Sequence, residues 1–238
     1  MGDHMIQSVL RGIGVFGVAL AAVAMFSGRG SSAPTVLPAA DVGAGLAPAA
    51  GEEVAIFSGG CFWGVQAVFQ HMKGVKSAVS GYTGGSLKNP GYEQVSTGTT
   101  GHAESVRVTF DPAQVSYVDL LRVFFSVATD PTELNYQGPD HGTQYRSVIW
   151  YTTPEQQRAA KAYIDQLTKA KVYQNKIVTE VKPAQPFYNA EAYHQDYATL
   201  HPDDGYIAYN DTPKVENFKK LLPSLYRDQP VLVGSAQQ

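Results

Sequence analysis

The sequence predicts an α+β domain: a two-layer α/β sandwich whose mixed sheet has a ferredoxin-like, split β-α-β core. Three observations support this fold class. Short apolar or alternating runs predict strands, amphipathic segments between them predict helices, and their order along the chain begins β-α-β-β-α-β. The chain has 238 residues, of which 44% are hydrophobic, enough for one domain of ordinary size with extensions.

The first half of the domain supplies three strands and one helix. A strand over Val54–Ser58 is followed by a glycine turn and a helix that runs through His71. Val75–Tyr82 forms the second strand, and a long loop rich in glycine, threonine and asparagine follows. Ala103–Phe110 alternates apolar and polar residues, which is typical of a half-buried strand.

The second half begins with a helix capped by Ser116. Its apolar face is formed by Val118, Leu121, Val123, Phe124 and Phe125. A strand over Ser147–Tyr151 follows, and Thr153-Pro154-Glu155 is a strong start for a helix that ends near Lys171.

The remaining elements are shorter. We expect a strand over Ile177–Val181, a short helix over Ala190–Leu200, and a last helix over Val215–Leu222 that ends before Pro223.

The ends of the chain differ in composition from the domain. Residues 1–26 contain a mildly basic lead and an apolar run of about fifteen residues, too short for an ordinary membrane span and suited to a signal peptide. We therefore expect an extracytoplasmic protein, periplasmic or secreted, with a membrane anchor as the alternative if the segment is not cleaved. Residues 27–52 are rich in alanine, proline and glycine and predict a linker. The domain then spans 53–227, and 228–238 form a loosely ordered tail.

Charge and cysteine content exclude some classes of function. A net charge of −3 gives no reason to expect a nucleic-acid partner. Cys61 is the only cysteine, so the chain has no intramolecular disulfide.

Cys61 lies in the glycine turn, in the stretch Gly59-Gly60-Cys61-Phe62-Trp63-Gly64. A thiol between a strand and a helix N-terminus is close to N–H groups that favour negative charge, which predicts a lowered thiol pKa and a nucleophile. Gly60 permits close approach by a substrate, and the two aromatic residues offer an apolar wall. The alternative is a small buried hydrophobic residue, the usual role of a free cysteine.

Other polar residues lie near element ends, where loops carry function. Glu104 begins a strand; if it is buried, desolvation raises its pKa and makes it a general acid, and if it is at an edge it is an ordinary solvated glutamate. Tyr82 and Tyr145 offer hydroxyl donors for a developing negative oxygen, or are core tyrosines. Asp140 orients neighbours or caps a turn.

The sequence gives little support for a metal site. Glu191 and His194 have the spacing of one carboxylate-histidine helix pair, but a di-metal bundle needs two such pairs. One cysteine cannot build a multi-cysteine zinc site. The histidines are expected to make structural hydrogen bonds, although a thiol hydrolase using Cys61 and one histidine as base stays open.

Five segments together resemble the peptide methionine sulfoxide reductases of the A type, from about Val54 to about Leu222. They are Gly60-Cys61-Phe62-Trp63-Gly64, Gly81-Tyr82-Thr83-Gly84-Gly85, Gly101-His102-Ala103-Glu104, Asp140-His141-Gly142-Thr143-Gln144-Tyr145-Arg146-Ser147 and Tyr193-His194-Gln195-Asp196-Tyr197. The resemblance implies an oxidoreductase that repairs oxidised proteins and peptides without a metal or bound cofactor.

The resemblance also implies roles for the catalytic residues. Cys61 would attack the sulfur of methionine S-sulfoxide and become a sulfenic acid, while Glu104 protonates the oxygen. Tyr82 and Tyr145 would hydrogen-bond that oxygen, and Asp140 would organise the site.

Substrate binding is implied for four further positions. Phe62 and Trp63 would pack on the substrate methyl group, and Gly60 and His194 would complete the binding site.

One departure from the family concerns recycling. Many members carry further cysteines that resolve the sulfenic acid, and this sequence has none. We therefore expect a monomer with a one-cysteine cycle completed by an external thiol: thioredoxin, glutaredoxin or a small-molecule thiol. A non-catalytic binder of oxidised methionine is a third hypothesis.

Overall fold

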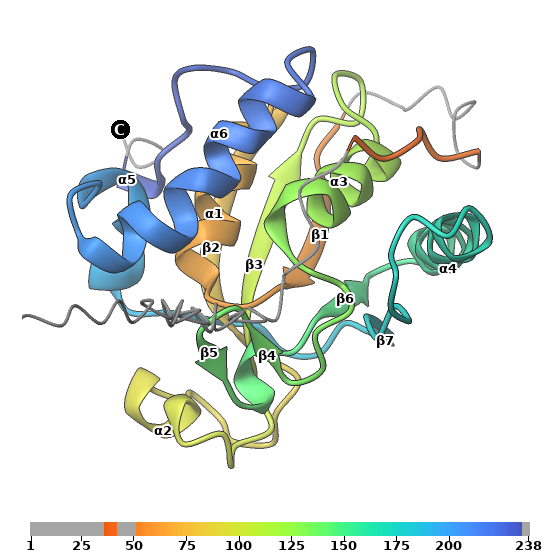
Figure 1. Cartoon of the computed structure of the whole chain (residues 1–238). Helices are drawn as coiled ribbons and strands as arrows, with labels where there is room; N and C mark the ends of the chain where they lie inside the picture. The colour runs from red at the N-terminus through yellow and green to blue at the C-terminus, as the bar shows by residue number, and fades with distance from the viewer. Residues whose placement is uncertain (1–35, 42–50, 235–238) are drawn as a thin grey trace, which may run out of the picture. The chain divides into compact units, whose positions relative to one another are not determined.

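The computed structural model describes residues 36–41 and 51–234, and within them a six-stranded sheet has the order β7-β6-β1-β3-β2-β8 (Figure 1). Its strands are β1 (Glu53–Ser58), β2 (Val75–Thr83), β3 (Ala103–Phe110), β6 (Val148–Tyr151), β7 (Glu180–Pro183) and β8 (Tyr188–Asn189). Only β6 and β7 pair in parallel; the other neighbours are antiparallel. The central order β6-β1-β3-β2 is that of the split β-α-β motif, so the predicted α+β, ferredoxin-like core is confirmed.

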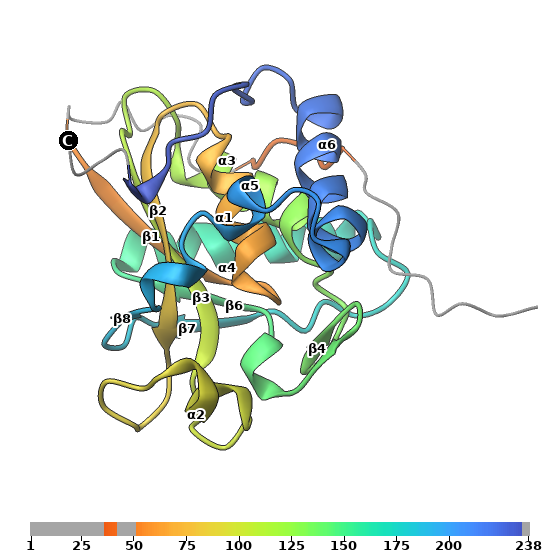
Figure 2. The same ribbon diagram turned by 90° about the vertical axis from the view of Figure 1, so that its left-hand side faces the viewer.

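The described residues include four longer helices. They are α1 (Phe62–Gln70), α3 (Tyr117–Val123), α4 (Pro154–Lys169) and α6 (Thr212–Leu221). The first packs on β2 and β3, whereas α4 packs on β6, β7 and α3. Figure 1 shows α6 running alongside α1, and the turned view of Figure 2 places α5 (Tyr197–Leu200) next to α1 as well. The C-terminal elements therefore gather around the helix that follows Cys61.

The main core lies between the helices and the sheet, and β1 shows how the sequence builds it. Ala55 and Phe57 are fully buried on the helix side, while Ile56 between them points to a smaller cluster on the other face with Trp150. The Phe57 ring stacks 5.0 Å from Phe69 of α1. Alternation in the strand therefore fixes which face of β1 the helices cover.

Two predicted helix starts are confirmed by their caps. The Ser116 hydroxyl accepts the N–H of Asp119 at 3.2 Å, and Thr153 accepts the N–H of Gln156 at 3.2 Å. The first of these helices does not end as a regular α-helix: it continues into a π-helical turn, η1 (Phe124–Ala128).

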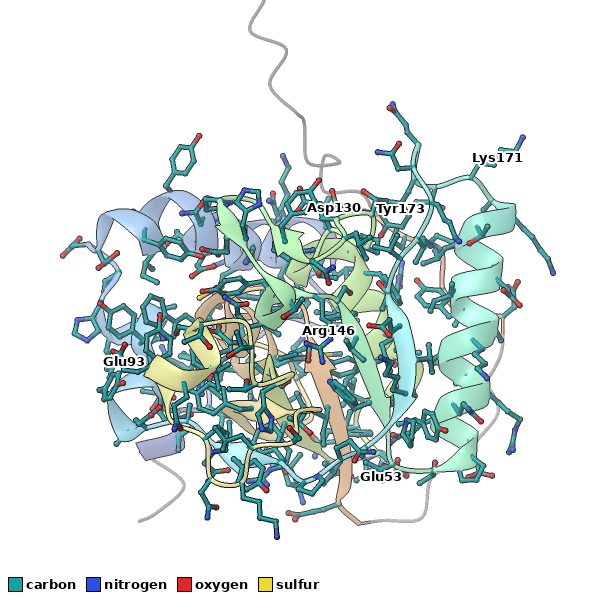
Figure 3. All side chains as sticks on the ribbon, turned by 90° about the horizontal axis from the view of Figure 1, so that it is seen from below. Glu53, Glu93, Asp130, Arg146, Lys171 and Tyr173 are labelled. Carbon is teal, nitrogen blue, oxygen red and sulfur yellow. The ribbon has the colours of Figure 1, made fainter. Side chains whose placement is uncertain are left out.

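Several short elements lie in loops for which the sequence predicts no helix or strand. They are α2 (Tyr92–Ser96), β4 (Tyr136–Gln137), β5 (Asp140–His141) and the 3-10 turn η2 (Thr143–Tyr145). Arg146, labelled in Figure 3, follows η2 and holds two of these loops together. Its guanidinium donates to the carbonyl oxygens of Gly101 at 2.9 Å and Thr143 at 2.7 Å.

Two predicted elements in the last third are wrong in detail. The strand expected over Ile177–Val181 begins later, as β7, where its backbone pairs with β6. The helix expected over Ala190–Leu200 is broken into a 3-10 turn, η3 (Ala192–His194), and α5, because Asp196 between them has a φ of 60°. That left-handed backbone cannot continue a helix.

Part of the predicted linker packs on the domain. Leu37 is only 1% exposed, its carbonyl accepts from Arg122 Nε at 2.8 Å, and the carbonyl of Pro38 accepts from Tyr163 Oη at 2.8 Å. For residues 36–41 the prediction of an unstructured linker is therefore wrong, because one buried leucine and these hydrogen bonds fix the segment against α3 and α4.

The start of the predicted tail is also held. The N–H groups of Val233 and Gly234 donate to the Asp196 carboxylate at 3.0 to 3.3 Å, and the N–H of Val231 donates to the carbonyl of Gln70 at 3.1 Å. Residues 228–234 are therefore ordered by contacts to α1 and to the break before α5, contrary to the prediction of loose order.

The predicted targeting segment, residues 1–26, lies outside the described residues. Among residues 36–41 and 51–234, no helix has the length and apolar character that crossing a membrane requires.

Candidate active site

Cys61 is presented by the turn between β1 and α1. Gly60 has a φ of +96°, and a Cβ atom there would lie 2.6 Å from the Cβ of Gln137. Only glycine satisfies both the backbone and the space, so the chain can turn sharply and leave Cys61 as the N-cap of α1. Cys61 is a free thiol, 8% exposed.

The electrostatics of Cys61 contradict one prediction. Burial raises the pKa of the Cys61 thiol well above its usual value, and the negative charges of Glu104 and Asp211 raise it further. The backbone N–H of Trp63 and the cation of Lys214 act in the opposite direction. The helix N-terminus is thus in place, but desolvation and two carboxyl groups outweigh it, and the predicted lowering of the pKa is wrong.

Glu104 lies on the second residue of β3, directly opposite Tyr82 of β2 in the antiparallel register. It is 2% exposed, and its Oε2 accepts the backbone N–H of Phe62 at 3.0 Å. Burial raises the pKa of the Glu104 carboxyl to about 8, against the effect of that hydrogen bond and with the help of the charge of Asp140. Glu104 is therefore a buried acid next to the residue that follows Cys61, rather than a solvated edge glutamate.

Tyr82 is fully buried, with its ring 5.7 Å from the ring of Phe62. Its hydroxyl donates to Oε2 of Glu191 at 2.9 Å. The other oxygen of Glu191 accepts the backbone N–H of Tyr92 at 2.8 Å. In this structure the phenolic proton of Tyr82 is thus directed to Glu191, a partner that the sequence did not suggest.

Asp140 lies in the β4-β5 hairpin, and Tyr145 lies in the η2 turn that follows it. Burial raises the pKa of Tyr145, and the charges of Glu104, Asp140 and Cys61 add to it, so this phenol interacts electrostatically with the same cluster. Asp140 accepts a 2.5 Å hydrogen bond from the Tyr206 hydroxyl. The hairpin therefore brings both predicted residues to the site, together with Tyr206, which was not predicted.

An aromatic wall adjoins the thiol. Phe62 is buried with its ring 5.1 Å from the ring of His194, and the half-buried Trp63 stacks on Tyr197 with ring centroids 4.0 Å apart. Trp63 donates from Nε1 to Nδ1 of His194 at 3.2 Å, so that nitrogen carries no proton. Burial lowers the pKa of His194, which fits a neutral ring. The predicted substrate-binding residues Phe62, Trp63 and His194 are therefore in mutual contact.

A charged pair behind α1 was missed by sequence reasoning. Nζ of Lys214 lies 3.0 Å from Oδ1 of Asp211, and both groups act on the pKa of Cys61. Asp211 ends a π-helical turn, η4 (Ile207–Asp211), and Lys214 lies in the first turn of α6. Nothing in an Asp-Thr-Pro-Lys helix start distinguishes a buried ion pair from an exposed one, so the sequence carried no signal for this pair.

The alternative chemistries find little support in the described part of the chain. No group of three or more histidine, cysteine, aspartate or glutamate side chains there can hold a metal ion. The groups that shift the pKa of Cys61 most are carboxyl groups, a backbone N–H and a lysine, and none is a histidine. These interactions give a cysteine hydrolase with a histidine base no support at Cys61.

Comparison with known proteins gives a consistent result. The family model described as peptide methionine sulfoxide reductase matches residues 53–224. The chain is 60% identical over 188 residues to peptide methionine sulfoxide reductase MsrA 2 of Mesorhizobium japonicum, covering 79% of this chain and 96% of the relative. It is 48% identical over 183 residues to MsrA 2 of Synechocystis, covering 77% and 86% of the two chains.

Solved structures show the same likeness. Reduced Mxr1 from Saccharomyces cerevisiae matches with a TM-score of 0.58 at 31% identity, over 65% of this chain and 88% of the other. Methionine sulfoxide reductase A of Corynebacterium diphtheriae matches with a TM-score of 0.55 at 36% identity, over 64% and 76% of the two chains.

Proposed function

This chain belongs to the peptide methionine sulfoxide reductase family, and we propose that it reduces the S epimer of methionine sulfoxide in oxidised proteins and peptides, with Cys61 as nucleophile and Glu104 as acid. The observation that carries this proposal is the buried Glu104 carboxyl, whose pKa is raised to about 8 beside a buried thiol. A sulfoxide sulfur is a poor electrophile until its oxygen is protonated or strongly hydrogen-bonded. An acid that keeps its proton near neutral pH supplies that proton.

The first step forms a bond between the Cys61 sulfur and the substrate sulfur while Glu104 transfers its proton to the sulfoxide oxygen. The oxygen then moves from the substrate sulfur to the Cys61 sulfur, and the bond between the two sulfurs breaks. The substrate sulfur is reduced by two electrons to methionine, and Cys61 is oxidised by two electrons to a sulfenic acid. The thiol proton returns to Glu104, which restores the acid for the next turnover.

The raised pKa of Cys61 fits this proton balance. Below about pH 8 Glu104 is protonated, and its negative charge no longer opposes ionisation of the thiol. The thiol loses its proton as the bond to the substrate forms, in a site where one acid and one nucleophile are separated by environment. Tyr82 and Tyr145 are proposed to donate to the same oxygen, which requires Tyr82 to turn from Glu191, and Asp140 is proposed to hold Tyr206 in place.

Phe62, Trp63, Gly60 and His194 are proposed to bind the substrate. The rings of Phe62 and Trp63 give an apolar surface for the methyl group beside the sulfoxide. Gly60 is proposed to contribute through the sharp turn that presents Cys61, since its backbone and the contact with Gln137 admit no side chain. The neutral His194 is proposed to fix Trp63.

Regeneration is proposed to use an external thiol, since Cys61 is the only cysteine in the sequence. One thiol attacks the Cys61 sulfenic acid, releases water and leaves a mixed disulfide. A second thiol attacks that disulfide, restores Cys61 and carries away the oxidised product. Thioredoxin, glutaredoxin and a small-molecule thiol each satisfy this balance, and steady-state rates with each reductant as sole donor would distinguish them.

The place of action is proposed to be extracytoplasmic, on the strength of the predicted targeting segment in residues 1–26. Fractionation of cells that express the full chain tests this, with mass analysis of the N-terminus to determine whether the segment is removed.

A single-turnover reaction without reductant tests the proposed chemistry. Enzyme mixed with an excess of a peptide that carries methionine S-sulfoxide should form one methionine per enzyme, and Cys61 should gain one oxygen atom. The R-sulfoxide peptide is the matched control and should give no methionine. Turnover of an ester or amide without reductant, or conversion of both epimers at equal rates, would contradict the proposal.

A further inference from the structure

A buried ion pair lies against the backbone of α1, one turn after Cys61. Asp211 is fully buried, and the side chain of Lys214 is 24% exposed while its ammonium group points inward to Asp211 at 3.0 Å. A Cβ atom on Gly64 would lie 2.1 Å from Oδ1 of Asp211 and 2.9 Å from Nζ of Lys214. Only the absence of a side chain at Gly64 lets both charges approach the first turn of the helix so closely.

The two carboxylate oxygens of Asp211 differ in their hydrogen bonding. Oδ1 of Asp211 accepts from Lys214, but Oδ2 is buried and has no hydrogen-bond partner in the described part of the chain. An unpaired buried carboxylate oxygen is costly, and a positive charge beside it is correspondingly hard to remove. The arrangement therefore holds a lysine charge next to the N-terminus of the helix that carries the thiol.

We propose that Lys214 is the counter-ion of the Cys61 sulfur when that sulfur is anionic, and that Asp211 positions Lys214 and limits its effect. The proposal deepens the function proposed above, because it concerns the same nucleophile. Lys214 and Asp211 are positioning residues that act through the charge on Cys61, and they are not assigned a contact with the substrate.

The signs of the interactions support these roles. Lys214 lowers the pKa of Cys61 and Asp211 raises it, while an ionised Cys61 and Asp211 raise the pKa of Lys214 despite its burial. A cation close to a cysteine favours the thiolate. Within this pair, the lysine is therefore the member that can balance the charge of the sulfur.

Other ionisable groups surround Cys61 from the neighbouring elements. They are Glu104 of β3, Tyr92 of α2, Tyr145 of η2 and Tyr206, which precedes η4, while Asp140 of β5 acts on Glu104 and Lys214. Glu104 is the other main carboxyl that raises the pKa of the thiol, and it loses its own proton near pH 8, below the raised pKa of Cys61. The test therefore compares variants with the wild type over a full pH range instead of at one pH.

The rate of alkylation of Cys61 by iodoacetamide as a function of pH is the direct measurement. Because the chain has one cysteine, alkylation measured on cysteine by peptide mass analysis reports Cys61 alone. We expect Lys214→Met to shift the alkylation profile to higher pH and slow the reaction roughly tenfold at a fixed pH below the midpoint, as one pKa unit requires. Asp211→Asn keeps an oxygen for Lys214 but removes the negative charge, and should speed alkylation by roughly threefold to tenfold.

Two controls make the result specific. Lys214→Arg keeps the charge and should stay within about twofold of the wild type, because the guanidinium is always protonated. The double variant Asp211→Asn/Lys214→Met should return toward the wild-type profile, since it removes both opposing charges. Thermal unfolding of each variant measures whether the fold is kept. If Lys214→Met does not fold, Asp211→Asn tests the proposal alone: faster alkylation supports it and slower alkylation contradicts it.

The outcomes separate this proposal from a purely structural role. Loss of packing would shift Lys214→Met and Asp211→Asn in the same direction, and that result, or an unchanged profile in Lys214→Met, would overturn it. The assay contains no sulfoxide, so it is independent of the proposed function. A wild-type enzyme that reduces no sulfoxide, yet shows the opposite shifts, would overturn the function and leave the counter-ion standing.

Discussion

Glu104 and Asp211 are two buried carboxyl groups that both raise the pKa of the Cys61 thiol, and their surroundings differ. Glu104 is on β3 and accepts one backbone N–H from α1, and no cation among the described residues is paired with it. Asp211 ends η4 and is paired with Lys214 at 3.0 Å. Burial raises the pKa of both, but only Asp211 has a lysine to oppose that rise. Both side chains are buried, so the degree of burial does not distinguish them. The lysine partner does: it favours the charged carboxylate of Asp211, whereas Glu104 without such a partner keeps its proton.

The largest expected effect is on catalysis, and it should distinguish the two carboxyl groups. Glu104→Gln removes the proposed proton donor but keeps the shape of the side chain, so the single-turnover rate should fall by roughly 10² to 10⁴-fold. Asp211→Asn should change that rate by less than about tenfold, since the proposed mechanism assigns Asp211 no proton transfer to the substrate. Equal losses in both variants would remove the distinction between them.

The second effect is on stability, where the order is reversed. Asp211→Ala leaves Lys214 without its partner in a largely buried site, and should lower the free energy of unfolding at pH 7 by about 3 to 5 kcal/mol. Glu104→Gln should not destabilise the fold at pH 7, because the charged form of Glu104 is already disfavoured by burial. Urea unfolding of both variants beside the wild type measures the difference; a more severe loss in Glu104→Gln would contradict it.

The third effect is the pH dependence of stability. The pKa of Glu104 is about 8 in the folded protein and near the usual 4.5 when unfolded. Between these values the folded state binds more protons, so the free energy of unfolding should fall with rising pH by up to about 1.4 kcal/mol per unit. Urea unfolding at pH 5, 6, 7 and 8 should show this slope in the wild type and a reduced slope in Glu104→Gln, whereas Asp211→Asn should retain it. A slope that survives in Glu104→Gln would assign it to another group.

The smallest effect concerns Asp140, whose charge acts on both carboxyl groups. Tyr206→Phe removes the hydrogen bond to Asp140 and should cost about 1 kcal/mol of stability and at most roughly fivefold in rate. Unfolding and single-turnover measurements on the same preparation check both. A loss as large as that of Glu104→Gln would make Tyr206 a proton donor in its own right.

Much of the fold was predictable because local patterns dominate it. The alternation of Ala103–Phe110 predicted β3 with its bounds, and the hydroxyls of Ser116 and Thr153 predicted two helix starts. The last third was less predictable because its backbone is set by distant contacts. The expected helix is broken at Asp196, whose carboxylate accepts hydrogen bonds from the N–H groups of Val233 and Gly234 near the end of the chain.

The site likewise contains residues that the sequence predicted and residues that it could not predict. Cys61 and Glu104 were found from their places at a turn and at a strand start, and from the family resemblance. The direction of the Cys61 pKa shift was predicted incorrectly, since the helix N-terminus is visible in sequence but the opposing charge of Asp211 and the depth of burial are not. Lys214 and Tyr206 lie some 150 residues along the chain from Cys61, and only the packing of α6 and η4 on α1 brings them to it.

The proposed chemistry requires that Glu104 keeps its proton at neutral pH beside the Cys61 thiol. Infrared difference spectra of the wild type minus Glu104→Gln, recorded as a function of pH, follow the carbonyl band of this one protonated carboxyl group. We expect the band to persist at pH 7 and to disappear with a midpoint of about 8. A midpoint near 4.5, with the carboxylate already formed at pH 7, would contradict it.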